Sequence, residues 1–480
     1  MHHEESLLIK NLKVFLIKSI RSALSTLSFP EVEFILAPPK TAKFGDISTN
    51  IALVLSKKIN QPPINIANAI ANVLKIEKLN YIDAITVSHP GFVNFLIDVA
   101  FYQNSILTIL EKNDQYGRSI AGKNKTANVE FVSANPTGPL TVGHGRNAVL
   151  GDTVANILKW NGFQVTREYY YNDAGQQMEI LGESVSARYF ELIDKEYEFP
   201  KDGYQGEYII DIAQNILEKF GNNISKRDPR FRTNAEKSIF EKIKSSLDKL
   251  GINFDQFTNE KTFYKTGAIE QLLADLKSKD LIYEKDGATW FQATAVGRKQ
   301  DRVYIKSSGQ PTYRLPDTAY HRDKINRGFD LIVNVFGADH TDSYPDVLAA
   351  LAALGFKTDH IRILLYQFVT LLRGGEKIKM STRKGDFVTL DNLMNETSPD
   401  VVRYFFIMRS MNSHLDFDLD LAKDQSNNNP VFYLQYAYAR ICNIIKHGMN
   451  TNYKINKNFD PNLLSHKDEI KLIRQLVYFP

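Results

Sequence analysis

The chain has 480 residues, a hydrophobic fraction of 43%, a charged fraction of 24% and a formal net charge of +4, which is typical of a soluble protein of several domains and permits a nucleic-acid partner without requiring one. Because Cys442 is the only cysteine, the composition excludes an intrachain disulfide and a zinc site built from cysteines, and a reducing, cytoplasmic setting is expected. The amino terminus lacks the basic and apolar segments of a signal peptide, and no apolar run is long enough to span a bilayer, so we expect no membrane partner.

Residues 1–115 are predicted to form a separate α+β module. Apolar residues recur at helical spacing through residues 1–27. Residues 89–96 alternate between apolar and polar side chains, as a strand does. The polar stretch 117–125 then predicts a linker to the next domain.

The region after this linker alternates between strands and helices. Residues 128–133 predict a strand rich in Val and Phe, a loop with two prolines follows, an amphipathic helix is predicted over 144–160, and 163–171 predict a second strand. This order indicates a parallel, doubly wound sheet. Residues 331–336 are continuously apolar, as a fully buried parallel strand should be, and a further strand is predicted over 361–368.

We therefore expect an α/β protein with a Rossmann-like domain made of residues 116–173 and 301–395. Residues 174–300 do not continue the alternation and predict a mostly helical insertion. Helical segments at 396–426 follow the sheet. After an Asn-Pro joint, residues 427–480 predict the start of a helical bundle.

The turn at residues 143–148, Gly-His-Gly-Arg-Asn-Ala, satisfies the G-x-G-x-x-A dinucleotide fingerprint, and Glu168 ends the next strand. A dehydrogenase is therefore one alternative. That fingerprint follows its strand almost directly, because its first glycine makes the turn into the helix. Here a loop with two prolines separates Ser133 from Gly143. The spacing disfavours a dehydrogenase.

A phosphate site is the better interpretation of this turn. His144 begins the helix, where free backbone N–H groups and the positive helix end favour an anion, and Gly143 lets a nucleotide approach the backbone. The imidazole can donate to phosphate oxygens as charge builds on the α-phosphorus. A second loop, Lys-Met-Ser-Thr-Arg-Lys-Gly at 379–385, follows a buried strand. Together the two loops suggest an ATP site; the alternatives are a surface histidine and a solvated basic loop.

Two acidic residues are candidates for binding a cationic substrate. Glu130 lies among Val and Phe residues of the first strand, and burying a carboxylate there without a partner is costly. Glu130 and Asp317 could accept paired N–H bonds from a guanidinium. The alternatives are a structural bond from Glu130 to Arg146 or to a backbone amide, and a helix N-cap by Asp317.

The turn that contains His144 resembles the HIGH signature of class I aminoacyl-tRNA synthetases, and residues 379–385 resemble their KMSKS loop. Thr141 replaces the first histidine of HIGH, and Thr382 stands at the fourth KMSKS position. Within that class the chain is similar to the arginyl-tRNA synthetases from end to end. The stretches that carry this similarity are 43–52, 129–147, 171–177, 204–213, 313–320, 337–340 and 413–422.

This resemblance implies which residues form the site. The implied catalytic residues are Thr141, Gly143, His144, Lys379, Ser381, Arg383 and Lys384. The implied ATP-binding residues are Pro136, Gly143, His144, Asp339, His340 and Met380. The implied arginine-binding residues are Glu130, Asn135, Tyr313 and Asp317, with Asn135 at the backbone end of the arginine. Which of Lys379, Arg383 and Lys384 contacts pyrophosphate stays open, and metal binding by Asp339 and His340 is disfavoured because no third ligand is evident.

The resemblance also implies the reaction: L-arginine and ATP give arginyl-adenylate and pyrophosphate, and the arginyl group then moves to tRNA(Arg). Arginine activation is expected to need the tRNA. Mg²⁺ is expected to come with the nucleotide, with no protein metal site and no zinc. The rivals are another HxGH-type ATP-dependent ligase or nucleotidylyltransferase, which Glu130 and Asp317 disfavour, and a non-catalytic tRNA-binding paralogue, which the retention of His144, Lys379 and Ser381 disfavours.

Three regions are implied to contact tRNA in a monomeric protein. They are the amino-terminal module, the 174–300 insertion and the amphipathic helix at 431–447, which carries Tyr and Arg suited to unstacked bases. Family members continue further beyond this helix, so we expect a chain truncated at Pro480 with an incomplete anticodon domain. Leu472, Leu476, Val477 and Phe479 are then expected to be exposed.

Overall fold

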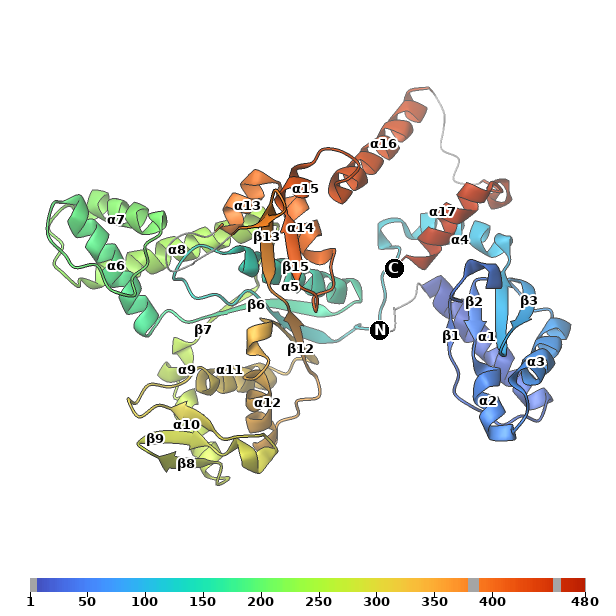
Figure 1. The fold of residues 1–480 in the computed structure, drawn as a ribbon, viewed down its shortest axis with the longest axis horizontal. Coiled ribbons are helices and arrows are strands. Elements are labelled where there is room, and N and C mark those ends of the chain that lie inside the picture. Colours follow the sequence, from blue (N-terminus) through green and yellow to red (C-terminus); the bar gives the residue numbers. More distant parts are fainter. Residues whose placement is uncertain (1–6, 379–387, 452–458, 480) are drawn as a thin grey trace. The chain divides into compact units, whose positions relative to one another are not determined.

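The computed structural model describes residues 7–378, 388–451 and 459–479. The chain folds into two compact units (Figure 1). One unit combines the amino-terminal residues up to Ser119 with the carboxyl-terminal segment from Asn452, and the other is Ile120–Thr451. Each unit has its own hydrophobic core.

The first unit contains a four-stranded antiparallel sheet in the order β1-β2-β4-β3. Its strands are β1 Leu36–Ala37, β2 Ile47–Thr49, β3 Ile82–Ser88 and β4 Phe92–Ile97. Its helices are α1 Leu7–Thr26, α2 Ile51–Ile59, α3 Pro63–Glu77 and α4 Val99–Lys112. The apolar residues that predicted a helix near the amino terminus line the buried side of α1, where Leu12, Leu16 and Ile20 are buried. The expected α+β module is therefore present.

The carboxyl-terminal helix α17, Lys467–Tyr478, packs on α4 within this first unit. Ile473 and Val477 lie in the core of the unit. Arg474 at the same interface forms an ion pair with Asp46 at 3.2 Å. The apolar face of α17 is thus covered by the amino-terminal module.

Residues 427–480, expected to begin a helical bundle, are divided between the two units, with α16 Pro430–Asn450 in the second unit and α17 in the first. The expected exposure of Val477 is wrong, because α4 covers that side of α17. Leu472, Leu476 and Phe479 are exposed, as expected.

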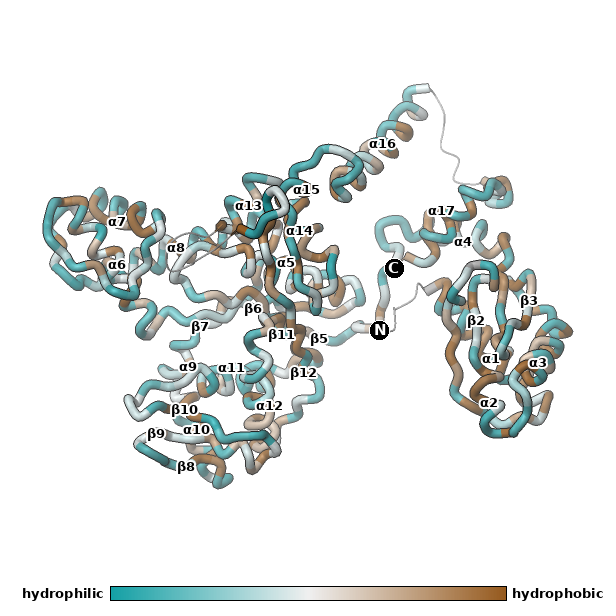
Figure 2. The backbone as a smooth tube through the Cα atoms, in the orientation of Figure 1, coloured by the Kyte–Doolittle hydropathy of each residue, from teal (hydrophilic) through white to brown (hydrophobic). Residues whose placement is uncertain are grey.

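The second unit contains a five-stranded parallel sheet in the order β12-β11-β5-β6-β7. Its strands are β5 Thr126–Glu130, β6 Gln164–Tyr171, β7 Gln256–Asn259, β11 Leu331–Gly337 and β12 Ile361–Tyr366. Helix α5, Val142–Trp160, connects β5 to β6 and packs against both β5 and β11. Hydrophobic residues run along β11 (Figure 2), as expected of a central parallel strand. The predicted parallel, doubly wound sheet is confirmed.

Two subdomains lie between β6 and β11. The first is a lobe of three helices that pack on one another (green in Figure 1): α6 Gln176–Leu192, α7 Glu207–Phe220 and α8 Pro229–Lys249. The second is a three-stranded antiparallel sheet of β8 Ile282–Lys285, β9 Ala288–Phe291 and β10 Arg302–Ile305, with α9 Lys261–Lys265 and α10 Ala268–Lys277.

The predicted insertion 174–300 is mostly helical, but it does not lie wholly outside the main sheet. Strand β7 separates the two subdomains and pairs with β6 in parallel. Its four residues, Gln-Phe-Thr-Asn, are too short and too polar to show an alternating pattern in the sequence. The sheet therefore takes its edge strand from a stretch that the sequence assigned to the insertion.

Helices α11 Arg314–Asn326 and α12 Tyr344–Ala353 precede and follow β11. The strand predicted over 361–368 ends at Tyr366, beyond which β13 begins a separate three-stranded sheet in the order β14-β13-β15. The remaining elements of this unit are β13 Val369–Arg373, β14 Glu376–Lys377, α13 Leu390–Glu396, α14 Pro399–Ile407, β15 Leu415–Asp418, α15 Leu419–Lys423 and α16 Pro430–Asn450. Across the described ranges, we find no helix with the length and apolar character that crossing a membrane requires.

The contact between α5 and β5 gives a testable prediction about the fold. A Cβ on Gly151 would lie 2.2 Å from Cγ of Phe131, so Gly151→Ala should lower the free energy of unfolding by about 1–3 kcal/mol. The control is Gly448→Ala in α16, where a Cβ meets nothing within 4 Å and alanine should be neutral or stabilising. Urea unfolding followed by circular dichroism measures both. Equal stability of the two variants would contradict the tight packing of α5.

Candidate active site

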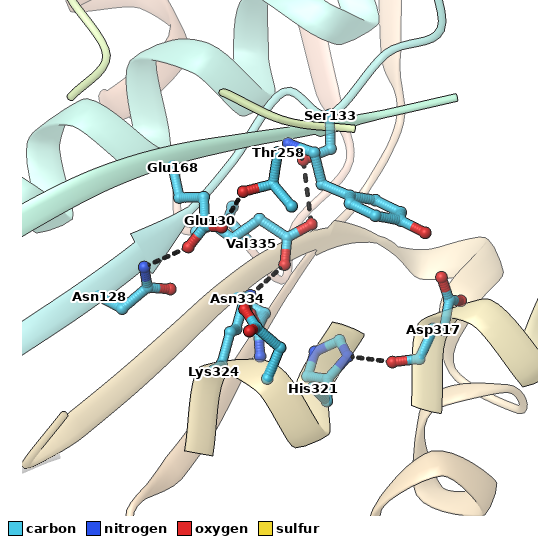
Figure 3. A network of polar contacts seen from close by, with 12 residues as sticks. Asn128, Glu130, Ser133, Glu168, Thr258, Asp317, His321, Lys324, Asn334 and Val335 are labelled. Atoms are coloured by element: carbon cyan, nitrogen blue, oxygen red, sulfur yellow. Dashed lines mark hydrogen bonds and ion pairs between the residues drawn. The ribbon is translucent and has the colours of Figure 1, made fainter. Parts of the chain in front are cut away.

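Two of the predicted site residues, Glu130 at the carboxyl end of β5 and Asp317 on α11, belong to a network of polar side chains from β5, β6, β11 and α11 (Figure 3). Glu130 is the last residue of β5 and only 2% of it is exposed. One carboxylate oxygen, Oε2, forms an ion pair with the ammonium of Lys324, and the other, Oε1, accepts a hydrogen bond from the Ser133 hydroxyl at 3.0 Å. The anticipated alternative partner, Arg146, binds backbone carbonyls instead, including those of Ser410 and Ser413.

The turn after β5 has an unusual backbone. Val132 and Ser133 have φ angles of 64° and 46°, a left-handed conformation that is rare for residues other than glycine and especially for a β-branched one. The buried side chain of Asn147 on α5 holds this turn: its Oδ1 accepts from the Val132 N–H at 2.7 Å, and its Nδ2 donates to the Val335 carbonyl at 2.9 Å. The turn places the Ser133 hydroxyl against Glu130. Asn147 is not among the residues that the sequence predicts for the site, although a polar residue on an otherwise buried face of a helix is a usable signal.

Thr141 and His144 cap the start of α5. Thr141 is the N-cap residue, its hydroxyl oxygen accepts from the His144 N–H, and its own N–H donates to Nδ1 of His144 at 3.2 Å. Because Nδ1 accepts, the ring proton of the neutral imidazole lies on Nε2, which is thereby a donor. Burial lowers the pKa of His144, so the neutral form prevails at physiological pH.

The glycines of α5 differ in what surrounds them. A Cβ on Gly145 would lie 2.6 Å from Cδ1 of Leu390, so packing inside the protein requires this glycine. A Cβ on Gly143 would meet only the Thr141 hydroxyl, at 3.7 Å. Packing therefore explains Gly145 but not Gly143, beside the helix start where an anion is expected.

Helix α11 carries Asp317, His321 and Lys324 at spacings of four and three residues, which places them on one face. Asp317 lies in the first turn of the helix, and its carboxyl group makes no hydrogen bond with any described residue. It is therefore not the N-cap that the alternative proposed. Burial, followed by the charges of Glu130 and Glu260, raises the pKa of Asp317 well above its usual value. A cation placed between Asp317 and Glu130 would relieve this repulsion.

The other residues expected to bind arginine lie at the rim of this cluster. Tyr313 precedes α11, is 55% exposed, and its ring lies 5.0 Å from the Arg314 guanidinium carbon. Asn135 is exposed; its Oδ1 accepts from the Asn172 N–H at 2.9 Å and its Nδ2 donates to Gln177 at 3.3 Å. The loop after β5 and the turn after β6 are thereby joined by a side chain that was expected to contact substrate.

The remaining residues expected to bind ATP divide into two groups. Pro136 is buried in the loop after β5. Asp339 and His340 follow β11, and their side chains are 65% and 47% exposed. Lys379, Met380, Ser381, Arg383 and Lys384 lie outside the described residues. Within the described ranges no three His, Cys, Asp or Glu side chains are grouped as a metal site requires.

Comparison with known proteins assigns three regions to families. Residues 105–405 match the family model described as tRNA synthetases class I (R), catalytic domain. Residues 15–97 match the arginyl tRNA synthetase N terminal domain, and 434–480 match the DALR anticodon binding domain.

Individual relatives agree with this assignment. The arginine–tRNA ligase of Salinibacter ruber is 45% identical over 98% of this chain and 87% of its own length. That of Desulfotalea psychrophila is 48% identical over 85% of this chain and 74% of its own length. A Campylobacter jejuni crystal structure assigned to the arginyl-tRNA synthetases is similar with a TM-score of 0.72 at 32% identity, covering 79% of this chain and 84% of that one.

The buried histidine of α11 gives a prediction about pH. Burial, followed by the nearby Lys324 ammonium, lowers the pKa of His321 to about 3 from an ordinary value of 6.5. The pKa of His321 is lower in the folded state than in the unfolded state, so the contribution of the neutral imidazole to stability is complete above pH 6.5. This contribution is lost on acidification, by up to ~1.4 kcal/mol per pH unit. His321→Gln should reduce the slope of unfolding free energy against pH between 6.5 and 5. An unchanged slope in urea unfolding would contradict the buried neutral state.

Proposed function

Because the chain belongs to the arginyl-tRNA synthetases of class I, we propose that these residues activate L-arginine with ATP and serve its transfer to tRNA(Arg). A carboxylate oxygen of arginine attacks the α-phosphorus, the bond to the pyrophosphate leaving group breaks, and arginyl-adenylate forms. A terminal ribose hydroxyl of the tRNA then attacks the activated carbonyl carbon, and AMP leaves. The observation that supports this most directly is the pair of acids formed by Glu130, at the carboxyl end of β5, and Asp317, in the first turn of α11.

The two acids form the proposed subsite for the arginine side chain. A guanidinium is planar and permanently charged, and its N–H groups fit paired carboxylate oxygens. Glu130 is held from two sides, and Asp317 has no ion-pair partner among described residues. Tyr313 and Asn135 at the rim are proposed to contact the rest of the amino acid, Asn135 at its backbone end. A lysine side chain, with a single ammonium, would leave part of this acceptor set unused.

The start of α5 forms the proposed phosphate subsite. The helix end favours negative charge, and Nε2 of His144 carries a proton that it can donate as charge develops on the α-phosphate. Gly143 and Pro136 would flank the triphosphate, Thr141 sets the cap, and Asp339 with His340 would meet the ribose and adenine. Mg²⁺ belongs to the ATP substrate in this scheme. Lys379, Ser381 and the cations after them would close the other side of the triphosphate.

The proposed partners follow from the same assignment. The amino-terminal module, the lobe of α6–α8 and the exposed aromatic residues of α16 are proposed to contact tRNA(Arg), with Tyr436 and Tyr438 placed to stack on unpaired bases. We further propose that the protein acts as a monomer in the cytoplasm.

Arginine-dependent ATP–pyrophosphate exchange in the presence of tRNA(Arg) tests the function. The wild-type chain should exchange with arginine and not with lysine or the other amino acids, and it should charge tRNA(Arg) with labelled arginine. His144→Ala should lower the exchange rate by roughly 10²–10³-fold, since it removes one transition-state donor. Exchange that favours another amino acid, or that is unchanged in His144→Ala, would overturn the assignment.

Substitution of Gly143 tests substrate binding separately from stability. In Gly143→Ala the new methyl has room inside the protein, and alanine favours a helix by about 1 kcal/mol, so the free energy of unfolding should stay equal or rise. If a nucleotide approaches the backbone here, KM for ATP should rise severalfold while KM for arginine changes little. Steady-state exchange and urea unfolding provide both measurements. An unchanged KM for ATP would remove Gly143 from the site.

A further inference from the structure

Lys324 is a fully buried lysine at the centre of the acidic cluster. Its ammonium pairs with Oε2 of Glu130, donates to Oδ1 of Asn334 at 2.6 Å, and lies 4.3 Å from the centre of the Tyr320 ring. Figure 3 shows it between the ends of β5 and β11, on the face of α11 that also bears Asp317. A buried ammonium is costly unless it is paired and hydrogen-bonded. Here the ammonium bonds to Glu130 of β5 and to Asn334 of β11.

The bonds that Glu130 already makes leave a specific acceptor pattern free. A carboxylate has about four lone-pair positions, two on each oxygen. Lys324 uses one position on Oε2, and Ser133 uses one on Oε1. One position on each oxygen therefore remains, which is the arrangement that accepts a bidentate guanidinium. The free positions are set by the two internal donors.

Two of the acids in the cluster already have cationic partners. Glu168, the neighbouring acid on β6, pairs with Arg327, whose Nη2 donates to both of its oxygens at 3.0 and 2.8 Å. Lys324 pairs with Glu130. Among the described residues Asp317 has no ion-pair partner, and neither has Glu260, whose carboxylate accepts from Tyr170 and Asn172. One guanidinium, shared by Asp317 and the free positions of Glu130, would supply the positive charge that Asp317 lacks.

We propose that Lys324 is a positioning residue for arginine recognition, orienting Glu130 so that one acceptor on each carboxylate oxygen faces the substrate guanidinium. This inference rests on the proposed function. Lys324 itself does not contact the substrate; it acts through Glu130. Its charge also opposes the effects of burial and of Glu130, which raise the pKa of Asp317, and a protonated carboxyl group accepts the guanidinium poorly.

This role predicts a pH dependence that packing alone would not produce. The titratable groups around Glu130 are Asp317, Tyr320, His321 and Lys324 on α11, Glu168 and Tyr170 on β6, and Tyr344 on α12. Burial raises the pKa of the three tyrosines and lowers that of His321, so none of these four gains charge near neutrality. Burial and the charge of Glu130 raise the pKa of Asp317, and the Lys324 ammonium opposes this rise. Removing the ammonium therefore raises the pKa of Asp317 further, so that arginine binding is lost as the pH falls.

The experiment compares Lys324→Met with Lys324→Arg and with a matched control, Arg327→Met, which removes the ion pairs that this residue, directly after α11, forms with Glu168 and Asp323. Exchange is measured with tRNA(Arg) from pH 6 to 9. Lys324→Met should raise KM for arginine roughly tenfold or more, with KM for ATP within about twofold, and its kcat/KM for arginine should rise with pH more steeply than that of the wild type. Lys324→Arg keeps the charge and should recover most of the arginine affinity and the wild-type profile.

Arg327→Met should lower the melting temperature without changing KM for arginine relative to KM for ATP. The proposal is overturned if Lys324→Met keeps the wild-type KM for arginine, if both KM values rise together, or if Arg327→Met reproduces the arginine effect. If Lys324→Met is insoluble, Lys324→Gln takes its place, since it keeps a donor for Asn334 without the charge. Absence of arginine-dependent exchange in the wild type would instead refute the proposed function, so the two failures are distinguishable.

Discussion

A carboxylate buried at the end of the central strand is the constraint around which this part of the structure is organised. Glu130 closes β5, where only 2% of it reaches solvent. A charge in such a place costs several kcal/mol unless partners replace its water. Lys324 and Ser133 supply those partners from α11 and from the turn after β5. The acid and its two donors connect strand, turn and helix, so the geometry of one cannot change without the others.

The turn that carries Ser133 shows what this arrangement costs. Two consecutive residues in the left-handed region, one of them the β-branched Val132, carry a strain of roughly 1–3 kcal/mol each. Asn147 offsets this strain by bonding the turn to β11, from a position inside α5. A relaxed turn would direct Ser133 elsewhere and leave one oxygen of Glu130 unbonded. The strained turn, the position of α5 and the orientation of the Glu130 carboxylate therefore depend on one another.

The sequence predicted the main elements well because their signals are local. β5, α5, β6 and β11 have clear apolar patterns, and each forms within a few residues of its predicted range. β7 was not predicted because four mixed residues carry no period, although β6 offers them an edge. The packing of α17 on α4 was missed because an apolar helix face does not reveal what covers it.

Local signals also decide which residues of the proposed site stand out in the sequence. Glu130 and Asp317 are conspicuous as acids beside apolar segments or within a recognisable motif. Lys324 was not singled out, because a lysine in a helix with other charges resembles a solvated residue. Its significance comes from the seven-residue spacing to Asp317, which is two helical turns, and from β5 and β11 lying opposite that face. Only the tertiary structure supplies the second condition.

The structure at the start of α5 shows what Thr141 does in place of the first histidine of the HIGH signature. The replacement removes an aromatic donor from the proposed phosphate subsite. In the structure Thr141 is the N-cap of α5, and threonine is among the residues that favour this position. Its backbone N–H fixes Nδ1 of His144 as an acceptor and so fixes Nε2 as the donor. The replacement therefore gives up one donor while orienting the other. Because burial also lowers the pKa of His144, the imidazole adds no positive charge to the proposed triphosphate subsite, and the positive end of α5 is the source of charge that the described residues offer there.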